Sequence, residues 1–399
     1  MPGFEIFGDE ERREVMEVLE TGVLMRYGFD GARKGRWKAR ELEAMLSERL
    51  GTRHAHVCSS GTTAVFTALC CCGVGADDEV IVPAFTFVAD LEAILFAGAV
   101  PVFGEIDATL TLSVEGIEAA ITPRTKAVLL VHMCGSMARV DAIRDLCDRR
   151  GLILIEDAAQ AMGATYKGQA LGSFGKAGCF SFDYVKTITC AEAGAVVTSD
   201  SDLFDKVQAF TDHGHDHVGS DRGAEKHPIL GMNFRISELH AAVGIAQMRK
   251  LDRILEAQRQ NKRVLKAAIA DLPGVTMREV PDEEGDSATF LSFFLPDEVT
   301  ARAAGRELPK AGVDGTFYWY DNNWHYIRKW DHIKQMATPQ RLHISLAQNS
   351  PLFTRPDLPV SDVWMSRMLS IQVKIGWSPS DLELRASRLR ETLQRLLGA

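Results

Sequence analysis

Short apolar runs alternate with longer amphipathic stretches over residues 55–200. The short runs are rich in β-branched residues, which predicts strands, whereas the longer stretches repeat apolar residues every three or four positions, which predicts helices. The predicted strands are HAHVCSS, EVIVPAF, VPVFGEI, KAVLLVHM and LILIEDA. Gly73, Gly98 and Gly151 follow helical stretches, as is typical of helix C-terminal caps. The alternation indicates an α/β fold whose mainly parallel sheet is covered by helices on both faces.

The pattern changes in the C-terminal part of the chain. Residues 235–270 predict one long helix, and residues 378–398 predict a helix with a serine N-cap, an early proline and a terminal glycine. Between them we predict strands at 287–295, 313–320 and 370–377, and a helix at 300–312. We therefore expect two domains: a large domain at 1–245 and a small C-terminal α+β domain at 246–399.

Composition and charge narrow the class of protein. The 399 residues are 46% hydrophobic and 25% charged, as in soluble globular proteins. The net charge of −9 argues against general binding to nucleic acid or to an acidic membrane, because both need clustered positive charge. The N-terminal stretch lacks the regions of a signal peptide, and no apolar run is long enough to span a bilayer. We therefore expect a cytoplasmic protein.

The cysteines and histidines do not predict a metal site. In a chain without an export signal the 8 cysteines are expected to be reduced thiols, and no CxxC pair indicates structural zinc. The run HGHDH contains His213, His215 and His217. Its spacing is that of a loop and no second group of ligands accompanies it, so we expect no bound metal.

A candidate phosphate site lies where the first predicted strand meets the first helix, in SSGTTAVFTAL. The start of a helix exposes unpaired N–H groups and the positive end of the helix dipole. Ser60, Gly61 and Thr62 could therefore bind a phosphate. The alternative is ordinary capping of the helix by Ser60.

A candidate acidic site ends the strand LILIEDA, where Glu156 and Asp157 point to opposite faces by strand alternation. The carboxyl end of a buried parallel strand is where open α/β sheets bind ligands. A buried carboxylate there needs a positive partner, and a protonated ring nitrogen would serve. The alternative is an N-cap for the residues that follow.

A single lysine, Lys186, lies between two further predicted strands, KAGCFSF and GAVVT. Taken alone it would be a solvated surface residue. Together with the phosphate site and Asp157, however, it completes the set of groups that hold pyridoxal 5′-phosphate (PLP): a phosphate cradle, a carboxylate for the ring nitrogen and an amine for the aldehyde. Phe87, in PAFTFVAD, is a candidate to stack on the ring.

The motifs that carry these residues resemble those of a known family, the DegT/DnrJ/EryC1/StrS sugar aminotransferases of the fold-type I PLP enzymes. Their order and spacing match over nearly the whole chain, which makes the resemblance specific. The motifs are SSGTTA, PAFTFVA, EIDATLTLS, ITPRTKAVLLVHMCG, IEDAAQAMGATYKGQALGSFG, SFDYVKTITCAEAG and GMNFRISELHAAVGIAQM. The resemblance implies a large domain around a mainly parallel seven-stranded sheet and a small C-terminal domain.

The resemblance also implies roles around the cofactor ring. Lys186 would form a Schiff base with the aldehyde, and Asp157 would pair with the ring nitrogen. Gln160 would lie close to the ring and its phenolic oxygen. Phe87 would stack on the ring face.

Further implied roles concern the cofactor phosphate and a second subunit. Ser60, Gly61, Thr62 and Ser181 would bind the phosphate within one chain. Asn233 would reach the phosphate of a neighbouring subunit, because the family builds each site from two subunits. The resemblance thus implies a homodimer with shared active sites.

Two positions depart from the family pattern. Position 183 is Asp where many relatives have His or Asn, and its charge would favour protonated Lys186 if the two lie close. Position 193 is Ala where many relatives have Gly. If that position had positive φ, alanine would cost about 1 kcal/mol and disturb the lysine loop.

The resemblance implies a transamination in two halves, from L-glutamate to the cofactor and then to a keto sugar. The stretches GTFYWYDNNWHYIRKWDHI, MPGFEIFG and RYGFD further resemble members that serve lipopolysaccharide biosynthesis. They imply an acidic acceptor, 3,8-dideoxy-8-oxo-D-manno-octulosonate. The alternative is a nucleotide-linked keto sugar or a cyclitol.

Both proposed substrates carry carboxylates, so cationic and sugar-binding side chains are expected. The candidate anion-binding residues are Arg26, Arg235, His213, His215 and His217. The candidate sugar-binding residues are Tyr318, Trp319, Tyr320, Trp324 and His325. The alternatives are structural ion pairs for the arginines, and core or dimer contacts for the aromatic residues.

Three other functions are disfavoured. A PLP-dependent sugar dehydratase usually carries histidine in place of Lys186. A binding protein without turnover would not need Asp157, Gln160 and Lys186 together. An NAD-dependent enzyme would show GxGxxG after its first strand, and this chain does not.

Overall fold

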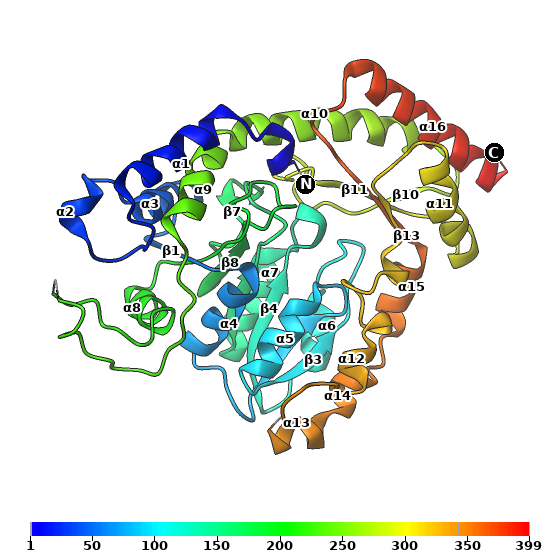
Figure 1. Ribbon diagram of the computed structural model, residues 1–399. Coiled ribbons are helices and arrows are strands. Elements are labelled where there is room, and N and C mark those ends of the chain that lie inside the picture. The colour runs from blue at the N-terminus through cyan, green and yellow to red at the C-terminus, as the bar shows by residue number, and fades with distance from the viewer. Residues whose placement is uncertain (1, 220, 342, 399) are drawn as a thin grey trace.

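The computed structural model describes residues 2–219, 221–341 and 343–398, and contains two main sheets (Figure 1). The larger sheet has 7 strands in the order β1-β9-β8-β5-β4-β2-β3. These strands are β1 His54–Cys58, β2 Glu79–Pro83, β3 Val100–Gly104, β4 Thr125–Val131, β5 Ile153–Asp157, β8 Ala177–Ser181 and β9 Gly194–Thr198. The predicted mainly parallel sheet of seven strands is confirmed.

Strand direction gathers the functional loops at one edge of this sheet. The pairs β3–β2, β2–β4, β4–β5 and β5–β8 are parallel, and β9 runs antiparallel to both β8 and β1. In register, Asp157 of β5 stands opposite Val131 of β4 and Cys179 of β8. The carboxyl ends of these strands therefore meet at the edge where open α/β sheets bind ligands.

Helices cover the large sheet as the sequence pattern predicts. They are α1 Asp9–Thr21, α2 Asp30–Arg33, α3 Lys38–Leu50, α4 Gly61–Cys71, α5 Val88–Phe96, α6 Val114–Ala120, α7 Val140–Arg150 and α8 Ser201–Phe210. The predicted glycine caps are confirmed, since Gly73, Gly98 and Gly151 have φ of 81°, 84° and 67°. Such left-handed conformations suit glycine and end a helix within one residue. A two-stranded hairpin of β6 Thr165–Tyr166 and β7 Gln169–Ala170 follows β5.

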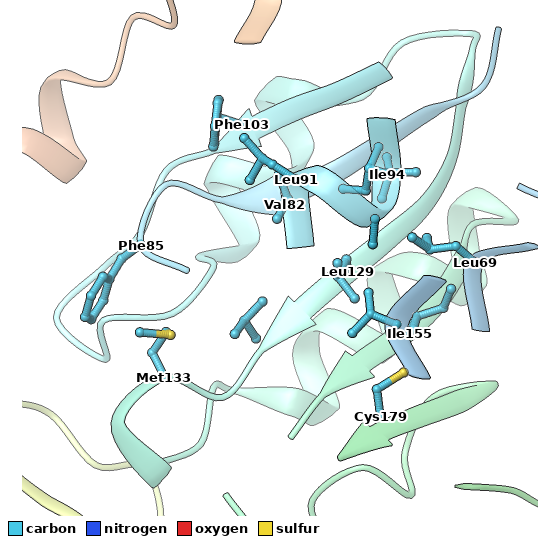
Figure 2. Packing of buried hydrophobic residues seen from close by; sticks show 14 of the residues in the cluster. Leu69, Val82, Phe85, Leu91, Ile94, Phe103, Leu129, Met133, Ile155 and Cys179 are labelled. Carbon is cyan, nitrogen blue, oxygen red and sulfur yellow. The ribbon is translucent and has the colours of Figure 1, made fainter. Parts of the chain in front are cut away.

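The core between the sheet and helices α4 and α5 fixes the strand ends that carry the site. Figure 2 shows Leu69 of α4 and Leu91 and Ile94 of α5 packing with Leu129 of β4 and Ile155 of β5. All five side chains are fully buried. Truncating any of them to alanine is expected to cost about 2–5 kcal/mol of stability.

The predicted long helix at 235–270 is wrong in one respect, because it is two helices, α9 Glu238–Arg249 and α10 Leu251–Ile269. The break lies at Lys250, whose Nζ donates to the Ile6 carbonyl at 2.9 Å and pairs with Glu11 at 2.6 Å. The N-terminal segment also contacts the stretch after the strand Met368–Gln372, where Glu5 accepts the Gly376 N–H at 2.8 Å. Apolar residues keep the spacing of a helix on both sides of the break, so the sequence pattern does not reveal it.

The smaller sheet has 4 strands in the order β10-β11-β13-β12 and packs against α10, α11 and α16. Its elements are β10 Thr276–Met277, β11 Phe290–Phe294, α11 Glu298–Lys310, β12 Thr316–Phe317, β13 Met368–Gln372 and α16 Pro379–Leu397. The predicted strand 313–320 is wrong beyond Phe317, where the chain turns into a 3₁₀-helix, Trp319–Asp321. The predicted strand 370–377 begins earlier, at Met368, and ends at Gln372.

A long connection between β12 and β13 lies against the large domain. It contains α12 Asp331–Lys334, α13 Ile344–Asn349, α14 Pro351–Thr354 and α15 Pro359–Arg367. Tyr326 forms a bridge with Phe85, and the Val88 N–H donates to the Trp324 carbonyl at 2.9 Å. Figure 1 shows these short helices, in orange, beside α5 and β3. The predicted boundary at 245/246 falls inside α9 and stays a prediction. In the described part of the chain, no helix combines the length and apolar character needed to cross a membrane.

Candidate active site

A cavity of about 390 Å³ lies at the carboxyl edge of the large sheet. Its size falls within the range of small-molecule sites, ~300–1,000 Å³. Eleven residues predicted for the site line it together: Ser60, Gly61, Thr62, Phe87, Asp157, Gln160, Ser181, Lys186, Trp319, Trp324 and His325. The first eight come from the large domain and the last three from the connection that follows β12.

The start of α4 forms one end of the cavity. The capping raised as an alternative is present, and the phosphate site stays a prediction. Ser60 caps the helix by accepting the Thr63 N–H at 3.1 Å. The N–H groups of Gly61 and Thr62 precede the first intrahelical bond and find no acceptor among the described residues. Two free N–H groups at a helix start suit a phosphate.

Two glycines allow this helix start to approach the sheet. A Cβ on Gly61 would lie 2.6 Å from the Cβ of Ser181, at the end of β8. A Cβ on Gly194 would lie 2.1 Å from the Ser60 carbonyl oxygen. Any larger residue at either position would push α4 away from the strands.

The two carboxylates at the end of β5 have separate tasks, as strand alternation predicts. Glu156 faces away from the cavity and accepts the N–H groups of Gly172, Phe174 and Gly175 at 2.6–2.8 Å. Asp157 lines the cavity and accepts the Ala159 N–H at 2.8 Å. Burial raises the pKa of Asp157 above its ordinary value, against the opposing effects of that N–H and of Lys186. A cationic ligand atom would relieve this cost.

Lys186 is half-buried at the cavity wall, and its Nζ lies 5.9 Å from the ring centroid of Phe87. Burial lowers the pKa of the Lys186 amine, although the charges of Asp157, Asp183 and Asp90 act in the opposite direction. The expectation that Asp183 holds the lysine protonated is therefore outweighed by desolvation. A lowered pKa favours the neutral, nucleophilic amine.

The positive φ considered for position 193 is found at position 191 instead. Among the described residues, Ala193 is not one of those with positive φ, whereas Ala191 has φ of 69°. The Ala191 N–H donates to Thr189 Oγ1 at 2.9 Å, which supports the turn. A side chain in this region costs about 1–2 kcal/mol, so the strain of the lysine loop sits two residues before the predicted place.

The other end of the cavity is aromatic. Trp324 stacks on Phe87 with ring centroids 5.7 Å apart, and His325 packs between Phe87 and Trp319. Burial, with a smaller effect of the Lys186 charge, lowers the pKa of His325 to about 3. Its Nδ1 lies 3.0 Å from Asn322 Oδ1 and, in the neutral ring, donates to that oxygen, so Nε2 is an acceptor.

Gln160 and Trp319 each offer one donor to the cavity. Gln160 accepts the Cys134 N–H through Oε1 at 2.8 Å, which leaves its amide NH₂ as the donor. The buried Nε1–H of Trp319 has no acceptor among the described residues. A ligand hydroxyl or carbonyl oxygen could bind either group.

Sequence reasoning missed several residues of the cavity, including Asp90, His132, Phe290 and Phe317. His132 contacts Glu156 Oε2 at 2.9 Å. Phe317 stacks on Trp319 with centroids 4.7 Å apart. Asp90 directly follows the motif PAFTFVA, and this position was the one signal in the sequence that could have indicated a role in the site.

Two of the predicted aromatic residues do not line the cavity. Tyr318 donates its hydroxyl hydrogen to the Ser366 carbonyl at 2.9 Å, and Tyr320 packs on Tyr326 with centroids 5.5 Å apart. Trp319 lines the cavity, whereas its two neighbours contact other parts of the chain. For these two, the alternative of a structural contact holds within this chain.

Neither predicted arginine lies in the cavity of its own chain. Arg26 is buried, donates to the Val57 carbonyl at 2.7 Å and pairs with Glu43. Arg235 pairs with buried Asp212. The predicted role of Arg26 as an anion clamp is therefore replaced by a structural ion pair.

The predicted histidines lie in the same outlying region as Arg235. His213 is exposed, His215 lies 2.8 Å from Glu225, and His217 lies 3.6 Å from Asp212. Asn233 is also exposed and accepts the Arg235 N–H at 3.3 Å. None of these residues lines the cavity of this chain.

The model of the DegT/DnrJ/EryC1/StrS aminotransferase family matches residues 6–383. The chain belongs to this family. The resemblance inferred from the motifs is thus confirmed at the level of the family, and the protein is a PLP-dependent aminotransferase.

Named relatives and solved structures agree with this assignment. GDP-perosamine synthase of Vibrio cholerae is 35% identical over 286 residues, 71% of this chain and 73% of that protein. L-glutamine:2-deoxy-scyllo-inosose aminotransferase of Streptomyces kanamyceticus is 37% identical over 293 residues, 67% of each chain. The structure of 3-amino-5-hydroxybenzoic acid synthase superposes with a TM-score of 0.80 at 28% identity and covers 98% of this chain and 97% of its own.

The residues present fit PLP. The free N–H groups of Gly61 and Thr62 suit its phosphate, and buried Asp157 suits a protonated ring nitrogen. Lys186 is the only lysine or arginine among the described residues that line the cavity. The donor set therefore matches each polar end of the cofactor.

Proposed function

We propose that this aminotransferase transfers an amino group from L-glutamate to C8 of 3,8-dideoxy-8-oxo-D-manno-octulosonate, for lipopolysaccharide biosynthesis. The enzyme would then be an 8-amino-3,8-dideoxy-D-manno-octulosonate aminotransferase. The observation that carries the general reaction is the placement of Lys186 and Asp157 in one cavity, opposite an aromatic wall. The resemblance of the stretch 315–333 and of the N-terminal motifs carries the acceptor.

Each catalytic residue has a defined task in this proposal. When bound, PLP draws electrons from the carbon that bears the transferred amine, so that this carbon can lose a proton. Lys186, once its amine is free, moves that proton between the substrate carbon and C4′ of the cofactor. Its lowered pKa suits a group that must accept a proton near neutrality. Asp157 holds the proton on the ring nitrogen.

The cofactor-binding tasks follow from the same cavity. Gly61, Thr62 and Ser181 bind the phosphate, with Ser60 capping the helix that supplies the N–H groups. Phe87 supports one face of the ring. Gln160 donates its amide to the phenolic oxygen.

The acceptor meets the aromatic wall. Neutral His325 accepts a sugar hydroxyl through Nε2, and Trp319 donates its unpaired indole N–H. Trp324 is exposed and stacks on Phe87, so it borders the path by which a sugar enters. All three groups are uncharged, which suits the hydroxyl groups of a sugar that carries no nucleotide.

The substrate carboxylates need a cation that this chain alone does not provide to its cavity. Lys186 is committed to the cofactor, and no other lysine or arginine of the described residues lines the wall. We propose that Arg235 and Asn233 of a second copy complete the site in a homodimer. Leu230, 93% exposed, and half-exposed Met232 flank them and would be buried in such an interface.

Mixed dimers test the shared site. One subunit carries Lys186→Ala and the other Asn233→Ala, so each has a single lesion. If Asn233 serves the partner, one site contains both lesions and the other is intact, and about half of the activity remains. Activity near zero would contradict sharing, because each chain would then hold its own lesion. A mixture of wild type with Lys186→Ala subunits is the control.

The acceptor is tested with enzyme preloaded in its amino form. We expect rapid turnover with the 8-oxo acid sugar and little with GDP-linked or UDP-linked 4-keto sugars. A preference for a nucleotide-linked sugar would support the second candidate, which the name of the relative GDP-perosamine synthase favours. Borohydride reduction should fix the cofactor to the peptide that contains Lys186, and a label on another residue would overturn the whole assignment.

A further inference from the structure

A second carboxyl group, Asp90, lines the same cavity as Asp157. Asp90 is the third residue of α5 and is 1% exposed, while Asp157 is 6% exposed. Both carboxyl groups line the same cavity, and burial and the charge of Asp157 together raise the pKa of Asp90. Thr86 donates its hydroxyl hydrogen to Asp90 Oδ2 from the preceding turn.

Two buried carboxyl groups in one cavity disfavour the state in which both are ionised, so one hydrogen is retained by the pair. Ionised carboxylates only accept hydrogen bonds, so two of them cannot bond to each other. Asp157 already accepts the Ala159 N–H, whereas the one donor to Asp90 among the described residues is the neutral Thr86 hydroxyl. The anion is better supported on Asp157, and the shared hydrogen therefore belongs to Asp90.

We propose that Asp90 is a positioning residue that remains a neutral carboxylic acid and donates its hydrogen to the Asp157 carboxylate. The proposal rests on the proposed role of Asp157 as partner of the cofactor ring nitrogen. The donated hydrogen bond fixes the orientation of Asp157 and keeps it ionised without adding a second negative charge beside the cofactor. The ring nitrogen then faces one oriented anion.

The surrounding charges agree with this assignment. Burial and the Asp157 charge raise the pKa of Asp90 well above its usual value, and Lys186 opposes this effect. The other titratable neighbours come from three elements: His132 after β4, Cys179 on β8 and His325 in the connection. Burial keeps the Cys179 thiol protonated by raising its pKa, and His325 is neutral, so neither supplies a compensating cation.

A purely structural role for Asp90 predicts a different result. Acidic residues in the first turn of a helix interact favourably with its dipole. In that case Asp90 would act as an anion, and Asp90→Asn would remove a charge near Lys186. If Asp90 is neutral, asparagine preserves both the charge and a hydrogen donor.

Three variants of the full chain separate these cases: Asp90→Asn, Asp90→Leu and the control Glu92→Gln. Glu92 lies on the same helix but outside the cavity, 3.7 Å from His332. The affinity for PLP is measured by titrating apoprotein. We expect Asp90→Asn and Glu92→Gln to match the wild type within about threefold, and Asp90→Leu to bind about tenfold to a hundredfold more weakly, the value of a hydrogen bond to a charged group.

Two spectroscopic readouts do not depend on turnover. The infrared band of a protonated carboxylic acid should be present in wild-type apoprotein and absent from Asp90→Asn. The pH midpoint of the absorption band of the Lys186-bound cofactor should be unchanged in Asp90→Asn. A lower midpoint in this variant, with no acid band in the wild type, would overturn the proposal, because removal of a nearby negative charge destabilises the cationic link.

If the proposed role of Asp157 is wrong, the experiments give a different result from the one expected if only the role of Asp90 is wrong. If Asp157→Asn binds PLP as tightly as the wild type, the role of Asp157 itself is wrong, whatever the state of Asp90. If only Asp157→Asn is impaired and Asp90→Leu behaves as the wild type, the role of Asp157 stands and that of Asp90 falls. The comparison of Asp90→Asn with the wild type remains decisive even if Asp90→Leu does not fold.

Discussion

The two walls of the cavity are built in different ways. The large-domain wall consists of strand ends and a helix start, held by a fully buried core that includes Leu129 and Ile155. The other wall consists of Trp319, Trp324 and His325, which belong to an irregular connection more than a hundred residues later in the chain. That connection is held by backbone bonds to the 85–88 stretch. The comparison suggests that the first wall supplies the chemistry and the second the choice of acceptor.

The largest effect is expected from the first wall. Lys186→Ala removes the amine that bonds the cofactor and moves the proton, so kcat should fall by at least about 10⁴-fold. The measurement is the rate of glutamate-dependent amine transfer, with cofactor content checked by mass spectrometry. The control is Lys176→Ala, which removes a surface lysine paired with Asp200. Comparable losses in both variants would contradict a special role for Lys186.

The adjacent carboxylates sharpen the comparison within this wall. Asp157→Asn should lower kcat by about 10²–10³-fold with little loss of stability, because it removes a charge that serves the cofactor. Glu156→Gln should instead destabilise the apoprotein by about 1.5–3 kcal/mol, because Glu156 holds three backbone N–H groups. Denaturant unfolding and single-turnover rates distinguish the two. An exchange of these effects would reverse the assignment of the two faces of β5.

The second wall is tested by splitting the reaction into halves. His325→Gln should weaken the half-reaction with the acceptor sugar by about tenfold, as one lost hydrogen bond implies, and leave the glutamate half nearly unchanged. Stopped-flow measurement of each half is the direct assay. Tyr318→Phe is the matched control, since Tyr318 lies on the same stretch but faces Ser366. Equal losses in both halves would show that this wall also serves the chemistry.

A smaller effect is expected on the way the free energy of unfolding changes at acidic pH. The pKa of His325 is lowered to about 3, mainly by burial, whereas the unfolded side chain titrates near 6.5. Between about pH 6.5 and 3 the unfolded chain therefore binds more protons, and the contribution of His325 to stability falls as the pH falls. His325→Gln should flatten this part of the stability profile, measured by denaturant unfolding from pH 7 to 4. An unchanged slope would contradict a neutral imidazole that is at least half-buried.

The smallest effect concerns the lysine loop. Ala191→Gly relieves a positive φ and should raise stability by about 0.5–1 kcal/mol. Ala193→Gly, whose position has no positive φ, should lower it by a similar amount. Thermal unfolding of the two variants gives opposite shifts if the backbone is as described.

The first wall could be predicted from the sequence because its parts are local. Ser60 and Gly61 sit at a strand–helix junction, and Asp157 ends an apolar run, so short patterns place them at the same edge of the sheet. Lys186 was found because the chemistry of one cofactor links it to these two sites. Its orientation toward the cavity depends on the fold of the loop, which no short pattern encodes.

The second wall could be predicted only in part. The sequence grouped Tyr318, Trp319 and Tyr320 as sugar-binding candidates and did not show that the strand would stop at Phe317, so it could not tell which of the three faces the cavity. Asp90 was missed because its role depends on its position near Asp157, which is distant in the sequence. The break at Lys250 was also missed, and its contacts with Ile6 and Glu11 of the N-terminal segment are likewise distant in sequence.

The N-terminal segment links parts of the molecule that move independently in many two-domain enzymes. Lys250 anchors it at the junction of α9 and α10, and Glu5 anchors it to the stretch after β13. A rotation of the smaller sheet about that junction would have to break the contacts of the N-terminal segment with either Lys250 or the stretch after β13. Access to the catalytic groups should accordingly be governed by movement of side chains such as Trp324 at the rim, while the frame around them stays rigid.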